Sequence, residues 1–282
     1  MNLGNLKIRN NLLLAPLQNI TTPAYRRFCK KFSKIGLVFI PMIYTKRINS
    51  NPQSIKEELS KIEEEKPISI QLMGRDLEDF KETLILLESY NVDAVDINAG
   101  CTSRRALNSK SGAYLIKDLN HLKKLLELVM KYSSYPVSLK TRIGESEPDN
   151  IKEITEIVNN SGIDFLTIHA RTIEGRFEKE ELNLKALKKF KELSNIPIIG
   201  NGDINTPQFA KKVLDYTNVD GLMIGRETMA NPEIFNQISN YLSNNTYKHF
   251  QNSLKLWYER VKLYEKCIDD FLNGINLSIS KG

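Results

Sequence analysis

Eight short apolar runs, each followed by a polar turn and a stretch of helical periodicity, restrict the fold of this 282-residue chain more than any other feature. Several runs are apolar almost throughout, as in parallel strands that are buried on both faces. Amphipathic stretches such as Leu77–Ser89 and Leu119–Tyr132 separate them. The runs span residues 12–17, 37–43, 68–73, 94–99, 137–143, 165–170, 196–202 and 221–226. Eight strand–helix units in about 230 residues predict an α/β fold, a (β/α)8 TIM barrel.

A doubly wound parallel sheet also alternates strands with helices, and it is the main alternative to the barrel. The sequence has no Gly-x-Gly-x-x-Gly after the first predicted strand. Because that motif forms the phosphate-binding turn of a dinucleotide-binding sheet, its absence favours the barrel.

The pattern changes near the C-terminus. Phe235–Leu242 has the spacing of the last barrel helix, and Tyr247–Asn273 reads as one further helix. The apolar residues that fall on one stripe of this further helix are Leu254, Trp257, Val261, Tyr264, Ile268 and Leu272. We predict a barrel domain over residues 1–242 and a short helical C-terminal segment over residues 243–282. The segment either packs on the barrel or forms a small recognition module.

Composition excludes several classes of protein. Hydrophobic residues make up 41% of the chain and charged residues 26%, which excludes wholesale disorder and coiled coil. No apolar run approaches the roughly 20 residues that span a bilayer, and the N-terminus lacks a signal-peptide pattern. Cys29, Cys101 and Cys267 are far apart and odd in number, which excludes a disulfide framework or a four-cysteine zinc site. We expect a cytoplasmic, monomeric protein without a metal site.

Positive charge is unevenly distributed along the chain. The formal net charge is +6, yet residues 1–56 contain no acid, and residues 97–117 form a second acid-free stretch. The ten bases of the first stretch are Lys7, Arg9, Arg26, Arg27, Lys30, Lys31, Lys34, Lys46, Arg47 and Lys56. This asymmetry suggests a surface that faces a polyanion such as nucleic acid. A solvated face of a lysine-rich protein is the alternative.

Polar residues and glycines fall at the ends of nearly every predicted strand. In a TIM barrel the functional groups gather where the strands end, at the carboxyl face. A purely structural barrel would not need so many polar strand ends. The segments are Ala15-Pro16-Leu17-Gln18, Gln71-Leu72-Met73-Gly74, Asn98-Ala99-Gly100-Cys101, Lys140-Thr141-Arg142, His169-Ala170-Arg171, Gly200-Asn201-Gly202-Asp203 and Gly225-Arg226.

These segments, with Asp96-Ile97 before Asn98 and Thr172 after Arg171, resemble the tRNA-dihydrouridine synthases in order and spacing over about residues 12–235. The resemblance implies an FMN-dependent barrel that reduces the C5–C6 double bond of uridine in tRNA, with NADPH or NADH as electron donor. It also implies the residues that bind FMN, which are Pro16, Leu17, Gln18, Gln71, Lys140, His169, Asn201, Gly202, Asp203, Gly225 and Arg226.

Physical chemistry gives several of these residues a role. Glycines such as Gly202 and Gly225 allow the backbone to approach a phosphate closely, and Arg226 supplies charge. Lys140 beside the ring would stabilise the negative charge of reduced flavin. Gln71 and His169 offer hydrogen-bonding groups to the ring or to the phosphate region. For each of them the alternative is a structural role, as a tight turn, an ion pair or a core residue.

Cys101 is the predicted catalytic residue. Hydride addition at C6 leaves negative charge at C5, and a thiol, mostly protonated at neutral pH, is able to quench it. Members of the family commonly have proline directly after this cysteine, whereas this chain has Thr102, whose hydroxyl is able to support a turn. Cys29 and Cys267 read as small buried hydrophobes. The residues predicted to contact the flipped uridine and its RNA are Asn98, Arg142, Arg171, Arg104 and Arg105.

Two other functions stay open at this point. The first is an FMN barrel that acts on a small molecule, like a dihydroorotate dehydrogenase or an ene-reductase. The second is a non-catalytic tRNA-binding barrel, which two departures from the family pattern suggest: Thr102 in place of proline, and a C-terminal segment shorter than the helical tRNA-binding domain that family members usually carry. The aromatic and basic residues of the further helix would then serve RNA binding alone; they are Trp257, Tyr258, Arg260, Lys262 and Lys266.

Overall fold

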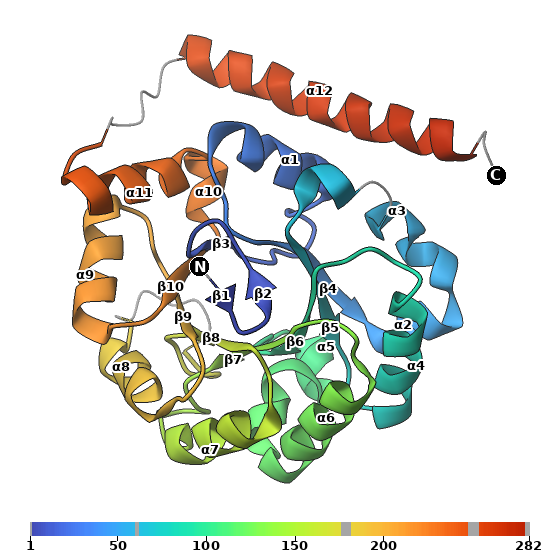
Figure 1. Cartoon of the computed structure of the whole chain (residues 1–282), viewed down its shortest axis with the longest axis vertical. Coiled ribbons are helices and arrows are strands. Elements are labelled where there is room, and N and C mark those ends of the chain that lie inside the picture. The colour runs from blue at the N-terminus through green and yellow to red at the C-terminus, as the bar shows by residue number, and fades with distance from the viewer. Residues whose placement is uncertain (1, 60–61, 176–181, 248–253, 280–282) are drawn as a thin grey trace.

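A computed structural model describes residues 2–59, 62–175, 182–247 and 254–279. The parallel strands within them are β3 Leu12–Leu14, β4 Val38–Tyr44, β5 Ile68–Met73, β6 Ala94–Ala99, β7 Val137–Arg142, β8 Phe165–His169, β9 Ile198–Asn201 and β10 Gly221–Ile224. They pair in the order β3-β10-β9-β8-β7-β6-β5-β4. A parallel bridge between Leu13 and Leu37 closes the sheet into a barrel (Figure 1). The predicted (β/α)8 barrel is confirmed, and β5 and β6 have the predicted bounds.

Helices surround the barrel. They are α1 Pro23–Phe32, α2 Thr45–Ser50, α3 Lys56–Leu59, α4 Leu77–Leu87, α5 Arg104–Asn108, α6 Leu119–Tyr132, α7 Ile151–Ser161, α8 Leu184–Leu193, α9 Pro207–Thr217, α10 Glu227–Ala230, α11 Ile234–Asn244 and α12 Leu254–Ile279. Thr22 and Thr206 cap α1 and α9, each of which starts with proline, so the sequence itself marks these helix starts. No helix among the described residues is long and apolar enough to cross a membrane.

The barrel interior is apolar at the end where the strands begin. A short hairpin, β1 (Asn2–Leu3) and β2 (Leu6–Lys7), lies across this end (Figure 1). Gly4 turns the hairpin with φ +57°, and a Cβ there would lie 2.3 Å from Asp164 Oδ1. The buried residues that form this part of the core are Leu3, Leu6, Ile8, Leu13, Ala15, Leu37, Phe39, Ala94, Phe165, Ile199 and Met223.

Polar side chains follow these apolar ones along the inner face. Side chains alternate between the two faces of a strand, so residues two and four positions after a buried inward residue also point inward. After Ala94 these are Asp96 and Asn98, and after Phe165 they are Thr167 and His169. The intervening residues pack outward against the helices in a second, larger core. The inner face therefore changes from apolar to polar toward the carboxyl ends of the strands.

Helix α12 packs on the outside of the barrel against α1 (Figure 1). The Tyr264 ring meets Phe28 edge-on, with ring centroids 5.5 Å apart. The predicted apolar stripe was partly wrong, because Trp257 and Leu272 are 60% and 50% exposed. The side chain of Leu254 lies outside the described residues. The buried face is instead centred on Cys267, which is buried as predicted, as is Cys29 on α1.

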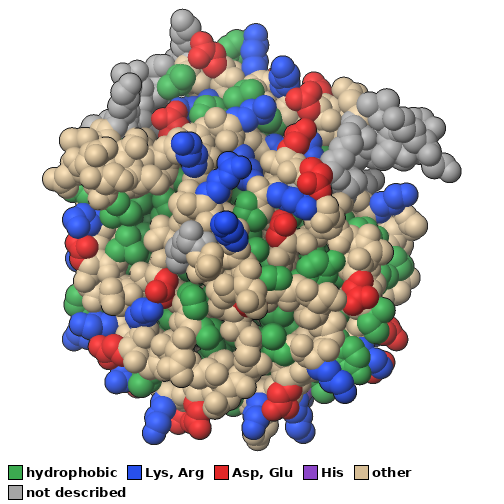
Figure 2. Space-filling view, in the orientation of Figure 1, with side chains coloured by type: hydrophobic (Ala, Val, Ile, Leu, Met, Phe, Trp, Pro, Cys, Tyr) green, Lys and Arg blue, Asp and Glu red, His purple; other side chains and the backbone are tan. Residues whose placement is uncertain are grey.

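Three of the N-terminal bases have structural roles, which corrects the interpretation of that charge run as surface. Arg26 and Arg27 are buried and bind the two carboxylate oxygens of Glu65, at 2.5 and 3.1 Å. Lys30 donates to the backbone oxygens of Glu65 and Lys66. Figure 2 also shows Lys and Arg side chains with acidic ones close beside them on the face that carries the hairpin. On this face, therefore, basic and acidic side chains are interspersed.

Candidate active site

A cavity of about 520 Å³ opens at the carboxyl ends of the barrel strands. Each of the eight strands, or the loop that directly follows it, contributes to the lining, so the cavity draws together segments far apart in the sequence. The lining residues are Ala15, Pro16, Leu17, Gln18, Met42, Gln71, Asn98, Gly100, Cys101, Lys140, Arg142, His169, Asn201, Gly202, Asp203, Gly225 and Arg226. All residues predicted to bind FMN lie here, with Cys101, Asn98 and Arg142.

The other predicted substrate residues do not line this cavity. Arg171 is buried, and its Nη2 donates to Asp203 Oδ2 at 2.6 Å. Arg104 and Arg105 are exposed on α5, where the Arg105 guanidinium lies 4.6 Å from the centre of the Tyr44 ring. Sequence reasoning missed Met42 as a lining residue. The register of β4 against β5 shifts between Ile40 and Ile43, so counting alternate residues along the strand fails there.

Lys140, on β7, lines the cavity. Its Nζ donates to Asn201 Oδ1 at 3.1 Å, and Asn201 Nδ2 donates to the backbone oxygen of Met223 at 2.8 Å. Burial lowers the pKa of Lys140 to about 8, against the opposing effect of the Asp96 charge. Burial also raises the pKa of Asp96 to about 6. A cation thus lines the cavity, with the buried carboxyl group of Asp96 close enough to affect its pKa.

The loop that follows β6 holds Cys101 at the edge of the cavity. Asn98 Oδ1 accepts hydrogen bonds from the backbone nitrogens of Gly100 and Cys101, at 3.1 and 2.9 Å. The Cys101 thiol donates to Ser103 Oγ at 3.4 Å, and the Cys101 carbonyl accepts from the Ala113 nitrogen at 3.0 Å. Main-chain and side-chain contacts therefore fix this loop, although proline does not follow the cysteine.

Arg142 and His169 also line the cavity. Arg142 Nε donates to the Gly100 carbonyl at 2.9 Å and Nη1 donates to the Thr172 carbonyl at 2.8 Å. Its guanidinium therefore holds the Cys101 loop as well as lining the cavity. Burial, together with the charges of Lys140, Arg142 and Arg171, lowers the pKa of His169 well below its ordinary value. His169 is neutral at physiological pH and retains one donor and one acceptor nitrogen.

The loops after β9 and β10 form one end of the cavity. Gly202 has φ +133°, and a Cβ there would lie 2.5 Å from Leu182, so only glycine fits this turn. Asp203 pairs with both Arg171 and Arg226. Burial raises the pKa of Asp203, but hydrogen bonds and charge from the two arginines outweigh it, and the net pKa is lowered. A smaller cavity of about 240 Å³ continues from here past Gly225 and Arg226.

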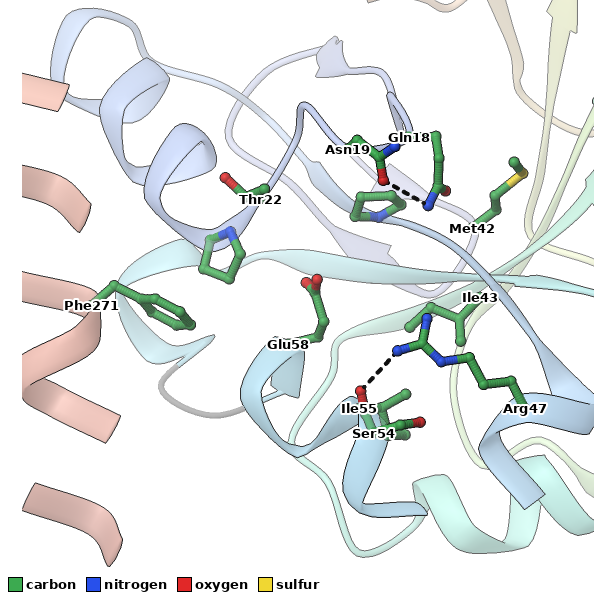
Figure 3. A pocket seen from close by; sticks show the side chains of 12 residues that line it. Gln18, Asn19, Thr22, Met42, Ile43, Arg47, Ser54, Ile55, Glu58 and Phe271 are labelled. Atoms are coloured by element: carbon green, nitrogen blue, oxygen red, sulfur yellow. Dashed lines mark hydrogen bonds between the residues drawn. The ribbon is translucent and has the colours of Figure 1, made fainter. Parts of the chain in front are cut away.

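A second cavity, of about 330 Å³, shares Gln18 and Met42 with the first. Figure 3 shows its mixed lining, with the Glu58 carboxylate, in this view, between the Phe271 ring of α12 and the Arg47 guanidinium. Arg47 Nη2 donates to the Ser54 carbonyl at 3.3 Å. The two cavities thus adjoin at the carboxyl end of the barrel, and both have linings that mix polar and apolar side chains.

Comparisons with known proteins agree with this geometry. A family model described as dihydrouridine synthase matches residues 13–275. The chain is 36% identical to tRNA-dihydrouridine synthase B of Pasteurella multocida (strain Pm70), over 83% of this chain and 70% of that one. It is 33% identical to tRNA-dihydrouridine synthase B of Escherichia coli (strain K12), over 86% and 75% of the two chains.

Solved structures show the same fold at much lower identity. Morphinone reductase superposes with a TM-score of 0.63 at 14% identity, over 88% of this chain and 90% of that one. This likeness concerns the barrel alone. The family match, by contrast, spans most of the sequence and every strand that lines the cavity. The chain belongs to the dihydrouridine synthase family.

Proposed function

We propose that this enzyme reduces uridine in tRNA to 5,6-dihydrouridine in the 520 Å³ cavity, using bound FMN that NADPH or NADH reduces. One observation carries the proposal. In a chain of this family, the side chains of Cys101, Lys140 and Arg226 come from three different strand ends and line a single cavity. The relatives named above are tRNA-dihydrouridine synthases, which supports tRNA as the substrate.

The chemistry of the lining fits FMN. Pro16, Leu17 and Met42 offer apolar surface for a flat ring, and Gln71 offers an amide to its polar edge. Lys140 and Arg226 are the cations that match a negatively charged ring and a phosphate group. TIM barrels commonly bind phosphate between the loops that correspond here to those after β9 and β10. FMN, when bound, supplies the hydride that adds to C6 of uracil.

Protonation of C5 is assigned to Cys101. Its thiol carries a transferable proton at the rim of the cavity, on a loop held by Asn98 and Arg142. Transfer of this proton, together with the hydride at C6, saturates the C5–C6 bond and leaves a thiolate that solvent reprotonates. Lys140 holds positive charge beside the reacting groups, and neutral His169 orients polar groups without adding charge.

The uridine must leave its stack to reach this cavity, as in other enzymes that act on a base. Asn98 and Arg142 line the cavity beside Cys101 and are the polar groups assigned to the carbonyl oxygens of uracil; Asn98 Nδ2 also donates to Gln71 Oε1. The adjoining cavity beside Arg47 and Phe271 gives room to a neighbouring part of the RNA (Figure 3). Arg104 and Arg105, exposed on α5 after the Cys101 loop, are positioned to contact its phosphates.

The test is reconstitution with purified protein, FMN, unmodified tRNA transcripts and either NADPH or NADH. We expect a yellow protein, dihydrouridine at defined positions and tRNA binding that weakens as salt rises. Sequencing of tRNA from cells that lack and regain the protein would identify the uridine. A colourless protein that takes up no FMN would overturn the proposal. FMN uptake without tRNA binding at low salt would favour a small-molecule substrate instead.

A further inference from the structure

A continuous line of hydrogen bonds runs inside the barrel from β7 to the Cys101 loop. Ser138 Oγ and Gln71 Nε2 each donate to the carboxylate of Asp96, both at 2.6 Å. Asn98 Nδ2 donates to Gln71 Oε1 at 2.8 Å. Asn98 Oδ1 then accepts from the backbone nitrogens of Gly100 and Cys101. Strand register places Gln71 and Ser138 directly on either side of Asp96.

The carboxylate determines the direction of this line. An ionised Asp only accepts hydrogen bonds, whereas Gln and Asn side chains have a donor end and an acceptor end. Since Asp96 takes the nitrogen of Gln71, the oxygen of Gln71 must face Asn98. Asn98 must then present its nitrogen to Gln71 and its oxygen to the loop. The reverse orientation would set amide nitrogens against the N–H groups of Gly100 and Cys101.

We propose that Asp96 is a positioning residue, which fixes the orientation of two amides and through them the loop that carries Cys101. Asp96 has no exposed surface and does not line the cavity, so it touches neither cofactor nor substrate. The consequence for catalysis rests on the proposed function, but the effect on the loop does not. The positioning role requires a hydrogen-bond acceptor that faces Gln71, and the Asp96→Asn variant retains one.

Hydrogen exchange in the ligand-free protein tests the loop directly. In Asp96→Ala we expect the protection of the Gly100 and Cys101 amides to fall about tenfold, because Asn98 is free to turn. Asp96→Asn should keep protection within about threefold of the natural protein. If Asp96→Ala fails to fold, Gln71→Met breaks the same line at its middle and should give the same loss. Unchanged protection in Asp96→Ala or in Gln71→Met would overturn the proposal.

Ser69→Ala is the matched control. Ser69 is fully buried on the same inner layer, and its Oγ has no hydrogen-bond partner among the described residues. Its removal should leave exchange at Gly100 and Cys101 unchanged; an equal loss in this control would show general softening of the barrel and overturn the specific role. In the enzyme assay, Asp96→Ala should lower kcat for dihydrouridine formation with KM for tRNA nearly unchanged. If amide protection falls as expected in the variants but the natural protein forms no dihydrouridine in tRNA, only the proposed function is refuted.

Discussion

The two ends of the barrel are built from the same strands but differ in almost every inward side chain. Where the strands begin, the hairpin residues Leu3 and Leu6 pack on Leu13 and Phe165 in a dry, apolar cluster. Where the strands end, cations, amides and a thiol surround a cavity of about 520 Å³. The change takes place within four residues along β6 and β8. A short strand can therefore contribute to stability at one end and to chemistry at the other.

A middle layer separates the two ends. Asp96 and Ser138 lie there and bind each other, while the Ser69 and Thr167 hydroxyls are buried with no hydrogen-bond partner among the described residues. Burying a hydroxyl without a partner costs free energy, so this layer trades stability for polarity. The barrel tolerates this loss of stability because the apolar cluster at the other end contributes stabilising burial. If the apolar end provides stability and the polar end provides activity, substitutions at the polar end should leave stability unchanged. Substitutions at the apolar end should leave activity per folded molecule unchanged.

The largest effect is expected at the polar end, from Cys101→Ala. Removal of a general acid typically costs 10²–10⁴-fold, so we expect dihydrouridine formation to fall by about 100-fold or more. FMN content, tRNA affinity and the free energy of unfolding should barely change, because the side chain is small and lies at the rim. Cys267→Ala, in the buried face of α12, is the control that should keep its rate per folded molecule. Full activity in Cys101→Ala would remove the proton-donor assignment.

The converse effect is expected at the apolar end, from Leu3→Ala. Leu3 is fully buried, and truncation of such a side chain costs about 2–5 kcal/mol of unfolding free energy. Urea unfolding followed by circular dichroism would measure it. The rate of dihydrouridine formation per folded molecule should match that of the natural protein. A large loss of rate with little loss of stability would show that the two ends are coupled.

A smaller effect is expected when pH changes the charge of Lys140, and it should alter activity at the polar end without affecting the apolar end. Burial lowers the pKa of Lys140 to about 8, so this cation loses its proton as pH rises through that value. If its charge supports the reaction, activity should fall about tenfold between pH 7 and 9, since roughly one side chain in ten stays charged at one unit above its pKa. Lys140→Arg keeps its charge over this range and should flatten the profile. An unchanged slope in that variant would assign the pH dependence to another group.

The barrel and the cavity lining were largely predictable from the sequence, because strand ends in a closed barrel must converge. The middle layer was not. Interpreting several strands as apolar almost throughout concealed the inward alternation of Ser69 with Gln71 and of Asp96 with Asn98, although Asp96 is a charged residue inside a strand. Charge counting also misled, because it does not reveal which bases meet a partner. The Glu65 carboxylate pairs with both Arg26 and Arg27, which lie 39 and 38 residues before it in the sequence.

The smallest predicted effect concerns α12, whose buried face differs from the apolar stripe predicted from the sequence. Trp257 and Tyr258 project from α12 with more than half of each side chain exposed, and the Lys262 ammonium lies 4.6 Å from the Tyr258 ring centre. Exposed aromatic rings beside cations suit stacking with unpaired bases. Trp257→Ala should therefore weaken tRNA binding a few-fold in a low-salt titration, with FMN content unchanged. Leu272→Ala, an exposed apolar residue further along the same helix, is the control and should bind normally. Equal affinity in both variants would confine RNA contacts to the barrel's carboxyl end, which would make the contrast between its two ends sharper still.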